Sequence, residues 1–144
     1  MCDLSCGIIP FYFSGGGVRF LLVFEAKGKG HWNFPKGHPK DGESERATAI
    51  REMYEEVGII PKCLLPGEPL LHEYSFVHRG EVVRRRIKYY PGLIGPNEEF
   101  VLQSDEISAV AMMTPEEIIA RVPSEARSLV SRALHVVMSW RGDA

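Results

Sequence analysis

Two runs of apolar, aromatic and β-branched residues near the start of the chain predict a pair of β-strands. The first run, CGIIPFYF, covers residues 6–13, and the second, VRFLLVFEA, covers residues 18–26. Short runs of this composition, bounded by turn signals, are typical of strands. The SGGG segment between them, residues 14–17, has the composition of a flexible turn.

A helix is predicted at residues 44–57, after a stretch whose pattern is that of a loop. Glycines, prolines and polar residues interrupt every periodicity at residues 27–43. In the segment that follows, apolar residues recur at three- and four-residue steps, which indicates an amphipathic helix. Its expected packing face consists of Ala47, Ile50, Tyr54 and Val57. Gly58 supplies a C-terminal stop signal.

The next segment begins with a predicted loop at residues 61–69 and continues with a predicted β-hairpin. Residues 70–78 and 82–94 have the composition of strands and flank a turn that contains HRGE. Pro91 and Gly92 fall near the end of the second strand, and we expect that strand to bulge or stop there.

The last third of the chain adds a strand at residues 106–113 and helices at residues 114–122 and 124–140. The first of these helices begins with a capping threonine, a proline at the next position and a glutamate three residues after the cap. Strands before, between and after helices predict an α/β fold, in which helices cover a mixed sheet. With 144 residues, we expect one domain spanning residues 1–144.

Composition and charge narrow the class of protein. With 25% charged residues, a net charge of −2 and a pI of about 6.2, the chain has no general positive excess that would favour nucleic acid or a membrane surface. The three cysteines suggest neither a metal-type pair nor a disulfide framework, and the start of the chain lacks the pattern of a signal peptide. We therefore expect a cytoplasmic protein without a membrane or a stable nucleic-acid partner. The oligomeric state is left open.

Three glutamates crowd one side of the predicted helix at residues 44–57. At about 100° per residue, Glu52, Glu55 and Glu56 fall within an arc of roughly 100°, opposite the expected packing face. Like charges at this spacing repel, so a cation between them would remove a cost. Carboxylate oxygens suit Mg²⁺ or a similar hard cation, and Arg51 could hold one carboxylate in place. The alternative is an acidic face that is simply solvated.

The spacing of these residues resembles the signature of the Nudix hydrolase family. Every fixed position of that signature is matched within residues 37–59, which we call the Nudix box: Gly37, Glu43, Arg51, Glu52, Glu55, Glu56, Val57, Gly58 and Ile59. The resemblance implies an α/β/α sandwich with a central mixed sheet, in which the box forms a loop, a helix and a loop. It also implies that water attacks a phosphoanhydride bond of a nucleoside polyphosphate, with Mg²⁺ or Mn²⁺ as cofactor.

The resemblance assigns metal and catalytic roles to individual residues. Glu55 and Glu56 would be the principal metal ligands, and Glu52 would be a ligand or the general base. Gly37 would offer its backbone carbonyl to the metal. Glu106, just before the late strand, would be a further ligand or base, and the alternative for it is an ordinary surface position in a loop. The identity of the general base is left open among these glutamates.

Residues around the glutamates are assigned supporting roles. Arg51 and Glu43 would orient the catalytic groups, and Gly58 would end the box helix. Lys36 would contact a phosphate beside the metal, and His38 would hydrogen-bond a phosphate oxygen. For both of these side chains the alternative is a solvated position in a loop.

The segments that flank the box suggest a substrate. HWNFPKGH at residues 31–38 and CGIIPF near the start resemble the asymmetrically cleaving diadenosine tetraphosphate hydrolases, which implies cleavage to ATP and AMP. The PKGH element also occurs in RNA 5′-pyrophosphohydrolases and in inositol pyrophosphate phosphatases, so both stay alternatives. A further alternative is a non-catalytic Nudix-fold module that binds a nucleotide, which the intact glutamates disfavour.

A tyrosine and a basic run in the predicted hairpin complete the candidate site. Tyr89 would stack on adenine, and the alternative is a tyrosine of the core. Alternation along the strand puts Arg84, Arg86 and Lys88 on one face. Arg86 and Lys88 would hold the distal phosphates of a long anionic substrate, and the alternative is an exposed strand edge protected by charge.

Overall fold

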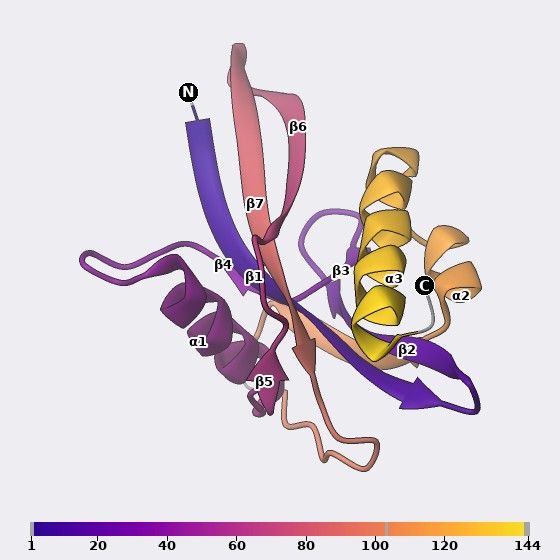
Figure 1. Cartoon of the computed structure of the whole chain (residues 1–144). Helices are drawn as coiled ribbons and strands as arrows, with labels where there is room; N and C mark the ends of the chain where they lie inside the picture. Colours follow the sequence, from indigo (N-terminus) through magenta and orange to yellow (C-terminus); the bar gives the residue numbers. More distant parts are fainter. Residues whose placement is uncertain (1, 103, 143–144) are drawn as a thin grey trace.

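Helices cover both faces of a central β-sheet. The computed structural model describes residues 2–102 and 104–142. Figure 1 shows helix α1 (Glu45–Val57) on one side of the sheet, and helices α2 (Pro115–Ile119) and α3 (Arg127–Arg141) on the other. This arrangement confirms the predicted α/β/α sandwich. Within the described ranges, no helix is long and apolar enough to cross a lipid bilayer, and a cytoplasmic location stays a prediction.

The described strands form one mixed sheet. They are β1 (Cys2–Ser14), β2 (Gly17–Glu25), β3 (His31–Asn33), β4 (Lys36–Gly37), β5 (Cys63–Leu64), β6 (Leu70–His78), β7 (Glu81–Leu93) and β8 (Ile107–Met113). The continuous path is β3–β2–β1–β7–β5, while β4 pairs with β1, β6 with β7 and β8 with β2. The two longest strands, β1 and β7, run parallel, and the other pairs are antiparallel.

Both ends of α1 and the start of α2 follow their capping signals. The Oγ of Ser44 accepts a hydrogen bond from the backbone N–H of Ala47 at the start of α1. Gly58 ends α1 in the left-handed conformation, with φ of 79°, and its N–H donates to the carbonyl of Tyr54. Thr114 forms the predicted capping box of α2. A short 3₁₀ helix at Ser124–Ala126 precedes α3.

Two of the segments predicted as loops contain short strands, so those predictions were wrong in part. Residues 27–43 contain β3 and β4, and residues 61–69 contain β5. Each of these strands has only two or three residues and is ordered by pairing with a distant long strand, β2, β1 or β7. No local periodicity can reveal an element of that length, because its order comes from tertiary hydrogen bonds.

The expected interruption of β7 at Pro91 and Gly92 was also wrong, because the strand continues to Leu93. Proline has no N–H to donate, but the carbonyl of Pro91 accepts a hydrogen bond of 2.9 Å from the N–H of Leu65. The missing side chain at Gly92 leaves room for Pro61, whose Cβ would lie 2.9 Å from a Cβ at position 92. Both residues therefore suit the strand at the point where it is covered by the chain after α1.

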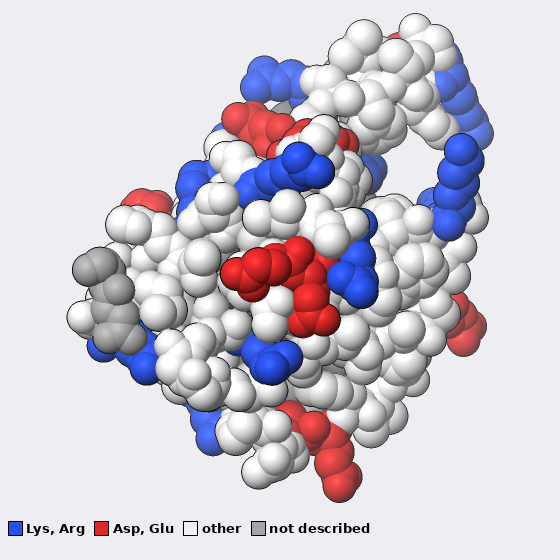
Figure 2. Space-filling model, turned by 90° about the vertical axis from the view of Figure 1, so that its right-hand side faces the viewer, with Lys and Arg blue, Asp and Glu red and all other residues white. Residues whose placement is uncertain are grey.

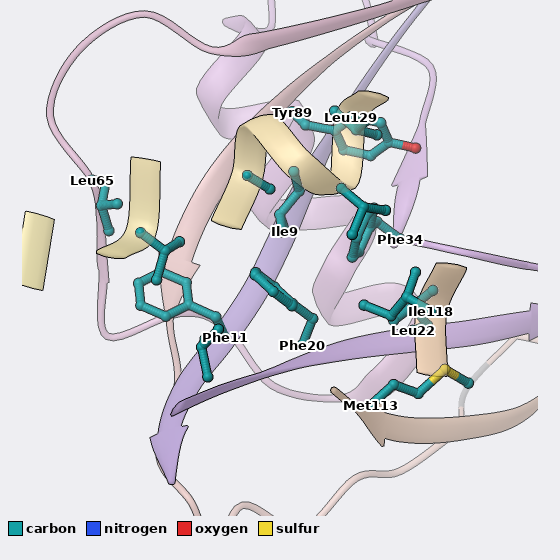
Figure 3. Packing of buried hydrophobic residues seen from close by; sticks show 14 of the residues in the cluster. Ile9, Phe11, Phe20, Leu22, Phe34, Leu65, Tyr89, Met113, Ile118 and Leu129 are labelled. Carbon is teal, nitrogen blue, oxygen red and sulfur yellow. The ribbon is translucent and has the colours of Figure 1, made fainter. Parts of the chain in front are cut away.

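Alternation along the long strands produces a hydrophobic core on each side of the sheet. On the α3 side, the buried residues include Ile9, Phe11, Phe20, Leu22, Phe34 and Tyr89, and Figure 3 shows their packing. On the α1 side, the buried residues include Ile8, Leu21, Val23, Ala49, Met53 and Val57. Successive residues of β1 and β2 therefore point to opposite layers, as the two-residue period of a strand requires. This packing on both sides fixes the sheet edges from which the candidate site is built.

Gly7 marks a close crossing between β1 and the segment that carries Lys36. The N–H of Ile8 donates to the carbonyl of Pro35 over 3.1 Å, and Gly7 is paired with Lys36. A Cβ at position 7 would collide with the carbonyl oxygen of Pro35 and would lie 2.8 Å from the Cβ of Lys36. Only glycine lets the two backbones approach this closely.

We predict that Gly7→Ala lowers the free energy of unfolding by about 1–3 kcal/mol, because the added methyl group pushes against backbone rather than a side chain that can rotate. Denaturant unfolding measures this. Gly17→Ala is the matched control, since the nearest atom to a Cβ there is 3.8 Å away. The control should change the free energy of unfolding by less than about 0.5 kcal/mol. Equal effects of the two substitutions would contradict the steric argument.

Candidate active site

A cleft of about 790 Å³ opens beside α1, within the size range of small-molecule sites. Figure 2 shows the surface hollowed beside the upper lobe, which the β6–β7 hairpin forms, with basic side chains on the rim. The carboxylates that line the cleft are Glu25, Glu52, Glu55, Glu56 and Glu106. The basic side chains that line it are Lys27, His31, Lys36, His38 and Arg85. The cleft thus brings together opposite charges from segments that are far apart in the chain.

The helix α1 reaches this cleft because its packing face differs from the predicted one. Ala47 is exposed and Tyr54 is 52% exposed, whereas Ala49 and Met53 are buried against the sheet. The expected face was therefore wrong at two of its four positions. Apolar residues with helical spacing occur on two overlapping stripes of this helix, and only contact with the sheet selects between them. The selected stripe lies next to Glu56 and turns that side chain inward.

A single guanidinium organises the acidic residues of the box. The Nε–H of Arg51 donates to Glu43 over 2.7 Å, and its Nη1 donates to Glu55 over 2.6 Å and to Glu52 over 3.4 Å. Its Nη2 donates to the backbone carbonyl of His38 over 2.9 Å. Charge-assisted contacts of this kind are among the stronger hydrogen bonds in proteins. Arg51 therefore joins the loop before α1 to two turns of the helix.

Glu43 is the residue most completely held by this network. Besides Arg51, the Oγ1 of Thr48 and the backbone N–H of Lys40 donate to its carboxylate, over 2.8 and 3.0 Å. The hydrogen bond from Arg51 is the main cause that lowers the pKa of Glu43 to about 2, from an ordinary value of 4.5. The carboxylate is thus kept ionised as a structural anchor of the box.

Glu56 has the opposite environment. Glu56 is only 7% exposed. Its Oε2 accepts a hydrogen bond of 3.2 Å from the backbone N–H of Lys36, whereas its Oε1 is buried without a hydrogen-bond partner among the described residues. Burial, followed by the nearby charge of Glu25, raises the pKa of Glu56 to about 8. Burial and the charge of Glu55 also raise the pKa of Glu52. These two carboxylates would gain from a cation beside them.

Gly37 lies directly over Glu52. A Cβ built at position 37 would collide with the carboxylate of Glu52, so any other residue would displace the glutamate. Gly37 is held there by its pairing with Cys6 in β1. The backbone of β4 and the acidic side of α1 are therefore in contact, as a site that combines a backbone carbonyl with carboxylates requires.

Glu25, at the end of β2, is a cleft residue that the sequence reasoning missed. Its carboxylate accepts a hydrogen bond of 2.5 Å from the Nδ2 of Asn33, lies 3.1 Å from the Nε2 of His31 and forms an ion pair of 3.5 Å with the Nζ of Lys36. A charged residue that ends a long apolar run was the available signal. Its position beside Glu56 was not visible in the sequence, because it depends on the pairing of β2 with β3.

A family model described as NUDIX domain matches residues 4–133. The chain belongs to the Nudix family. It is 36% identical over 81 residues to the bis(5′-nucleosyl)-tetraphosphatase [asymmetrical] of Rattus norvegicus, which covers 52% of this chain and 55% of that protein. It is 41% identical over 79 residues to the enzyme of the same name from Sus scrofa, covering 51% and 54%.

The chain therefore spans about half the length of the curated relatives it matches. A crystal structure of a C. elegans Ap4A hydrolase binary complex superposes with a TM-score of 0.74 at 24% identity, and the match covers 96% of this chain and 98% of that one. At this level of identity, the structural similarity shows the fold alone.

The Nudix box of this chain has the features that a divalent cation needs. The donors are oxygens, which hard cations prefer, and the buried Oε1 of Glu56 lacks any other partner among the described residues. As arranged, no three acidic, histidine or cysteine side chains in the described ranges are gathered closely enough to form a metal cluster. In this arrangement Arg51 contacts both Glu55 and Glu52. The residues present fit a cation, provided that Glu55 exchanges its contact with Arg51.

The sequence-predicted residues Lys36, His38 and Glu106 also line the cleft of the Nudix chain. The Nε2–H of His38 donates to Asp3 over 2.7 Å. Glu106 is exposed, and its backbone carbonyl accepts a hydrogen bond of 2.9 Å from Ala26. The structure therefore brings these three residues to the glutamates of the box, from β4, from the loop that follows it and from the segment before β8.

Tyr89 does not lie in the cleft, and its expected role in adenine stacking is corrected here. Its residue is 2% exposed, and its ring packs edge-on against Phe34 with 5.7 Å between centroids. Tyr89 shares a strand face with Ile87, and α3 covers that part of the face. The aromatic side chain that lines the cleft is instead Tyr74 of β6.

Arg86 and Lys88 also lie outside the cleft, on the other face of β7. The Nζ of Lys88 donates to Glu45 in the first turn of α1 over 2.9 Å, and the Nε of Arg86 lies 3.2 Å from Glu73. Arg85 is the member of the basic run that lines the cleft. The predicted alternation was right, but the sequence could not indicate which face of the strand looks toward the cleft.

We predict that acid destabilises the protein partly through Glu43. Because its pKa is lowered in the folded protein, its contribution is complete above the ordinary value of 4.5 and is lost as the pH falls toward 2. Between about pH 6 and about pH 2, Glu43→Gln should therefore lose less unfolding free energy than the parent chain. Denaturant titrations at a series of pH values measure this. The exposed Glu68→Gln is the control, and parallel curves for all three proteins would refute the assignment.

Proposed function

We propose that this chain is a divalent-cation-dependent hydrolase of phosphoanhydride bonds that cleaves diadenosine tetraphosphate to ATP and AMP. The observation that carries the proposal is one cleft lined by both charges: the carboxylates of the Nudix box, which we call the acidic wall, and the basic side chains of β4 and the β6–β7 hairpin, which we call the basic wall. Relatives named bis(5′-nucleosyl)-tetraphosphatase [asymmetrical] support the substrate. A polyphosphate with a bound cation fits this cleft, because the carboxylates would bind the cation and the basic side chains would bind the phosphates.

The acidic wall would hold the cation. Glu52, Glu55 and Glu56 supply carboxylates, Gly37 supplies a backbone carbonyl, and Glu106 supplies a further carboxylate from the segment before β8. When bound, Mg²⁺ or Mn²⁺ neutralises phosphate charge and lowers the pKa of a water molecule. The buried oxygen of Glu56 supports this arrangement, because it would otherwise stay without a partner.

The chain itself supplies the proton acceptor and the phosphate contacts. Glu56 and Glu52 have raised pKa values without a cation, and either carboxylate could take the proton of the attacking water once a cation restores the ionised form. Lys36 and Arg85 would bind phosphate oxygens, and His38 would donate a further hydrogen bond. Tyr74 replaces Tyr89 as the ring that would stack on a base, a contact worth about 1–3 kcal/mol.

We predict that Glu56→Gln lowers kcat by about 10²–10⁴-fold, because a glutamine neither accepts a proton nor ligates a hard cation well. In the same variant, Mg²⁺ should no longer raise the melting temperature as it does in the parent chain, since a ligand stabilises only the protein that binds it. Glu81→Gln, at an exposed position outside the cleft, is the control. Unchanged turnover and unchanged cation stabilisation in Glu56→Gln would reject the metal assignment.

A substrate panel tests the reaction itself. With Mg²⁺ present, we expect diadenosine tetraphosphate to be cleaved to equal amounts of ATP and AMP, and with higher kcat/KM than 5′-triphosphate RNA or an inositol pyrophosphate. Chromatography of the products with each substrate measures this. A preference for RNA or for the inositol compound would overturn the substrate but keep the hydrolase. Binding of diadenosine tetraphosphate without turnover would instead favour a non-catalytic module.

A further inference from the structure

Asp3 joins two basic side chains of the cleft that come from distant parts of the chain. Its Oδ1 accepts a hydrogen bond of 2.7 Å from the Nε2–H of His38, which lies within the box. Its Oδ2 accepts a hydrogen bond of 2.9 Å from the Nε–H of Arg85, and the Nη2 of the same guanidinium lies 2.9 Å away as an ion-pair contact. His38 and Arg85 are thus both fixed to one carboxylate at the start of β1. Asp3 lies outside the Nudix box and has no part in the function proposed above.

Arg85 is held in a single orientation by three neighbours. Asp3, Arg85 and Tyr74 form a row across β1, β7 and β6, because each is directly opposite the next in the strand register. The guanidinium lies 4.8 Å from the ring centre of Phe76, and its Nη1 donates to the hydroxyl of Tyr74 over 3.4 Å. A planar guanidinium that is stacked and hydrogen-bonded in this way loses less freedom when it meets an anion.

His38 is held at both its backbone and its ring. Arg51 donates to its carbonyl oxygen over 2.9 Å, and Asp3 accepts from its ring. The ring is nevertheless 66% exposed and lines the cleft together with Arg85. Asp3 therefore connects the fixed backbone of the box to the basic side chain of the hairpin.

We propose that Asp3 is a positioning residue, which fixes Arg85 and His38 to receive the phosphates of the substrate that lie beyond those next to the box glutamates. The inference rests on the proposed function and names a residue that sets affinity for the longer polyphosphates. Asp3 does not itself touch the phosphates. It acts through the two donors, so its removal weakens binding and leaves the chemical step in place.

The sign of the effect separates this role from simple electrostatics. Asp3 is a negative charge near a site for a polyanion, so its removal would strengthen anion binding if only its charge mattered. Positioning predicts the opposite result, because an unfixed arginine must be ordered when the anion binds. A matched ion pair exists on the other face of the hairpin, where Glu73 contacts Arg84 and Arg86 outside the cleft.

The test is calorimetric titration of the whole protein with inorganic tripolyphosphate in the presence of Mg²⁺, together with steady-state kinetics on diadenosine tetraphosphate. Asp3→Ala should weaken tripolyphosphate binding and raise KM by about tenfold, which corresponds to the loss of roughly one charged hydrogen bond. Its kcat should change by less than about twofold. Asp3→Asn keeps an oxygen acceptor for Arg85 and should recover part of the affinity. Glu73→Ala should bind like the parent chain.

A double-mutant cycle tests whether Asp3 acts through Arg85. In an Arg85→Ala background, Asp3→Ala should weaken tripolyphosphate binding much less than it does in the parent chain, because Asp3 can no longer act through Arg85. Binding in both Asp3 variants that equals or exceeds that of the parent overturns the proposal, as does a parent chain that fails to bind tripolyphosphate. If tripolyphosphate binding weakens as expected while no dinucleoside polyphosphate is hydrolysed, the proposed function fails and the role of Asp3 stands.

Discussion

The contact between Arg51 and the carboxylates of the box is the interaction on which the rest of the site depends. Like charges one helix turn apart destabilise a helix by about 0.2–0.5 kcal/mol per pair, and this helix carries several. One guanidinium reaches Glu43, Glu52 and Glu55 and also the carbonyl of His38. It therefore holds an acidic helix and an acidic loop together without a cation.

Burial of Glu56 is the second constraint, and it is more costly than the surface repulsion. An ionised carboxylate taken out of water loses several kcal/mol of solvation, which explains why its pKa rises to about 8. The apolar side of α1 offsets this cost, since buried side chains such as Met53 and Val57 contribute about 1.5–3 kcal/mol each. Packing thus holds in place a carboxylate that would otherwise turn to solvent.

The two walls of the cleft come from different structural rules. Helical periodicity and the box loop build the acidic wall, whereas the pairing of β4 with β1 and of β7 with β1 and β6 places the basic side chains Lys36 and Arg85. Two glycines allow these segments to lie in contact. The absence of a side chain at Gly7 leaves room for the segment that contains Lys36, and its absence at Gly37 leaves room for the carboxylate of Glu52. Carboxylates outside the box, Glu25 and Asp3, then hold the basic side chains in position.

The sequence by itself determined the order of the helices and the longer strands, the ends of α1 and the set of acidic residues in the box, because capping and strand alternation are local properties of the chain. It also predicted Lys36 and His38 as cleft residues, because they adjoin or lie within a motif of fixed spacing, and Glu106, because it lies at the start of the late strand. Only the tertiary structure decided that Arg85 lines the cleft in place of Arg86 and Lys88, and Tyr74 in place of Tyr89. The physical reason is that alternation divides a strand into two faces without saying which one is covered. Which face is covered depends on the helix or strand that packs against the sheet.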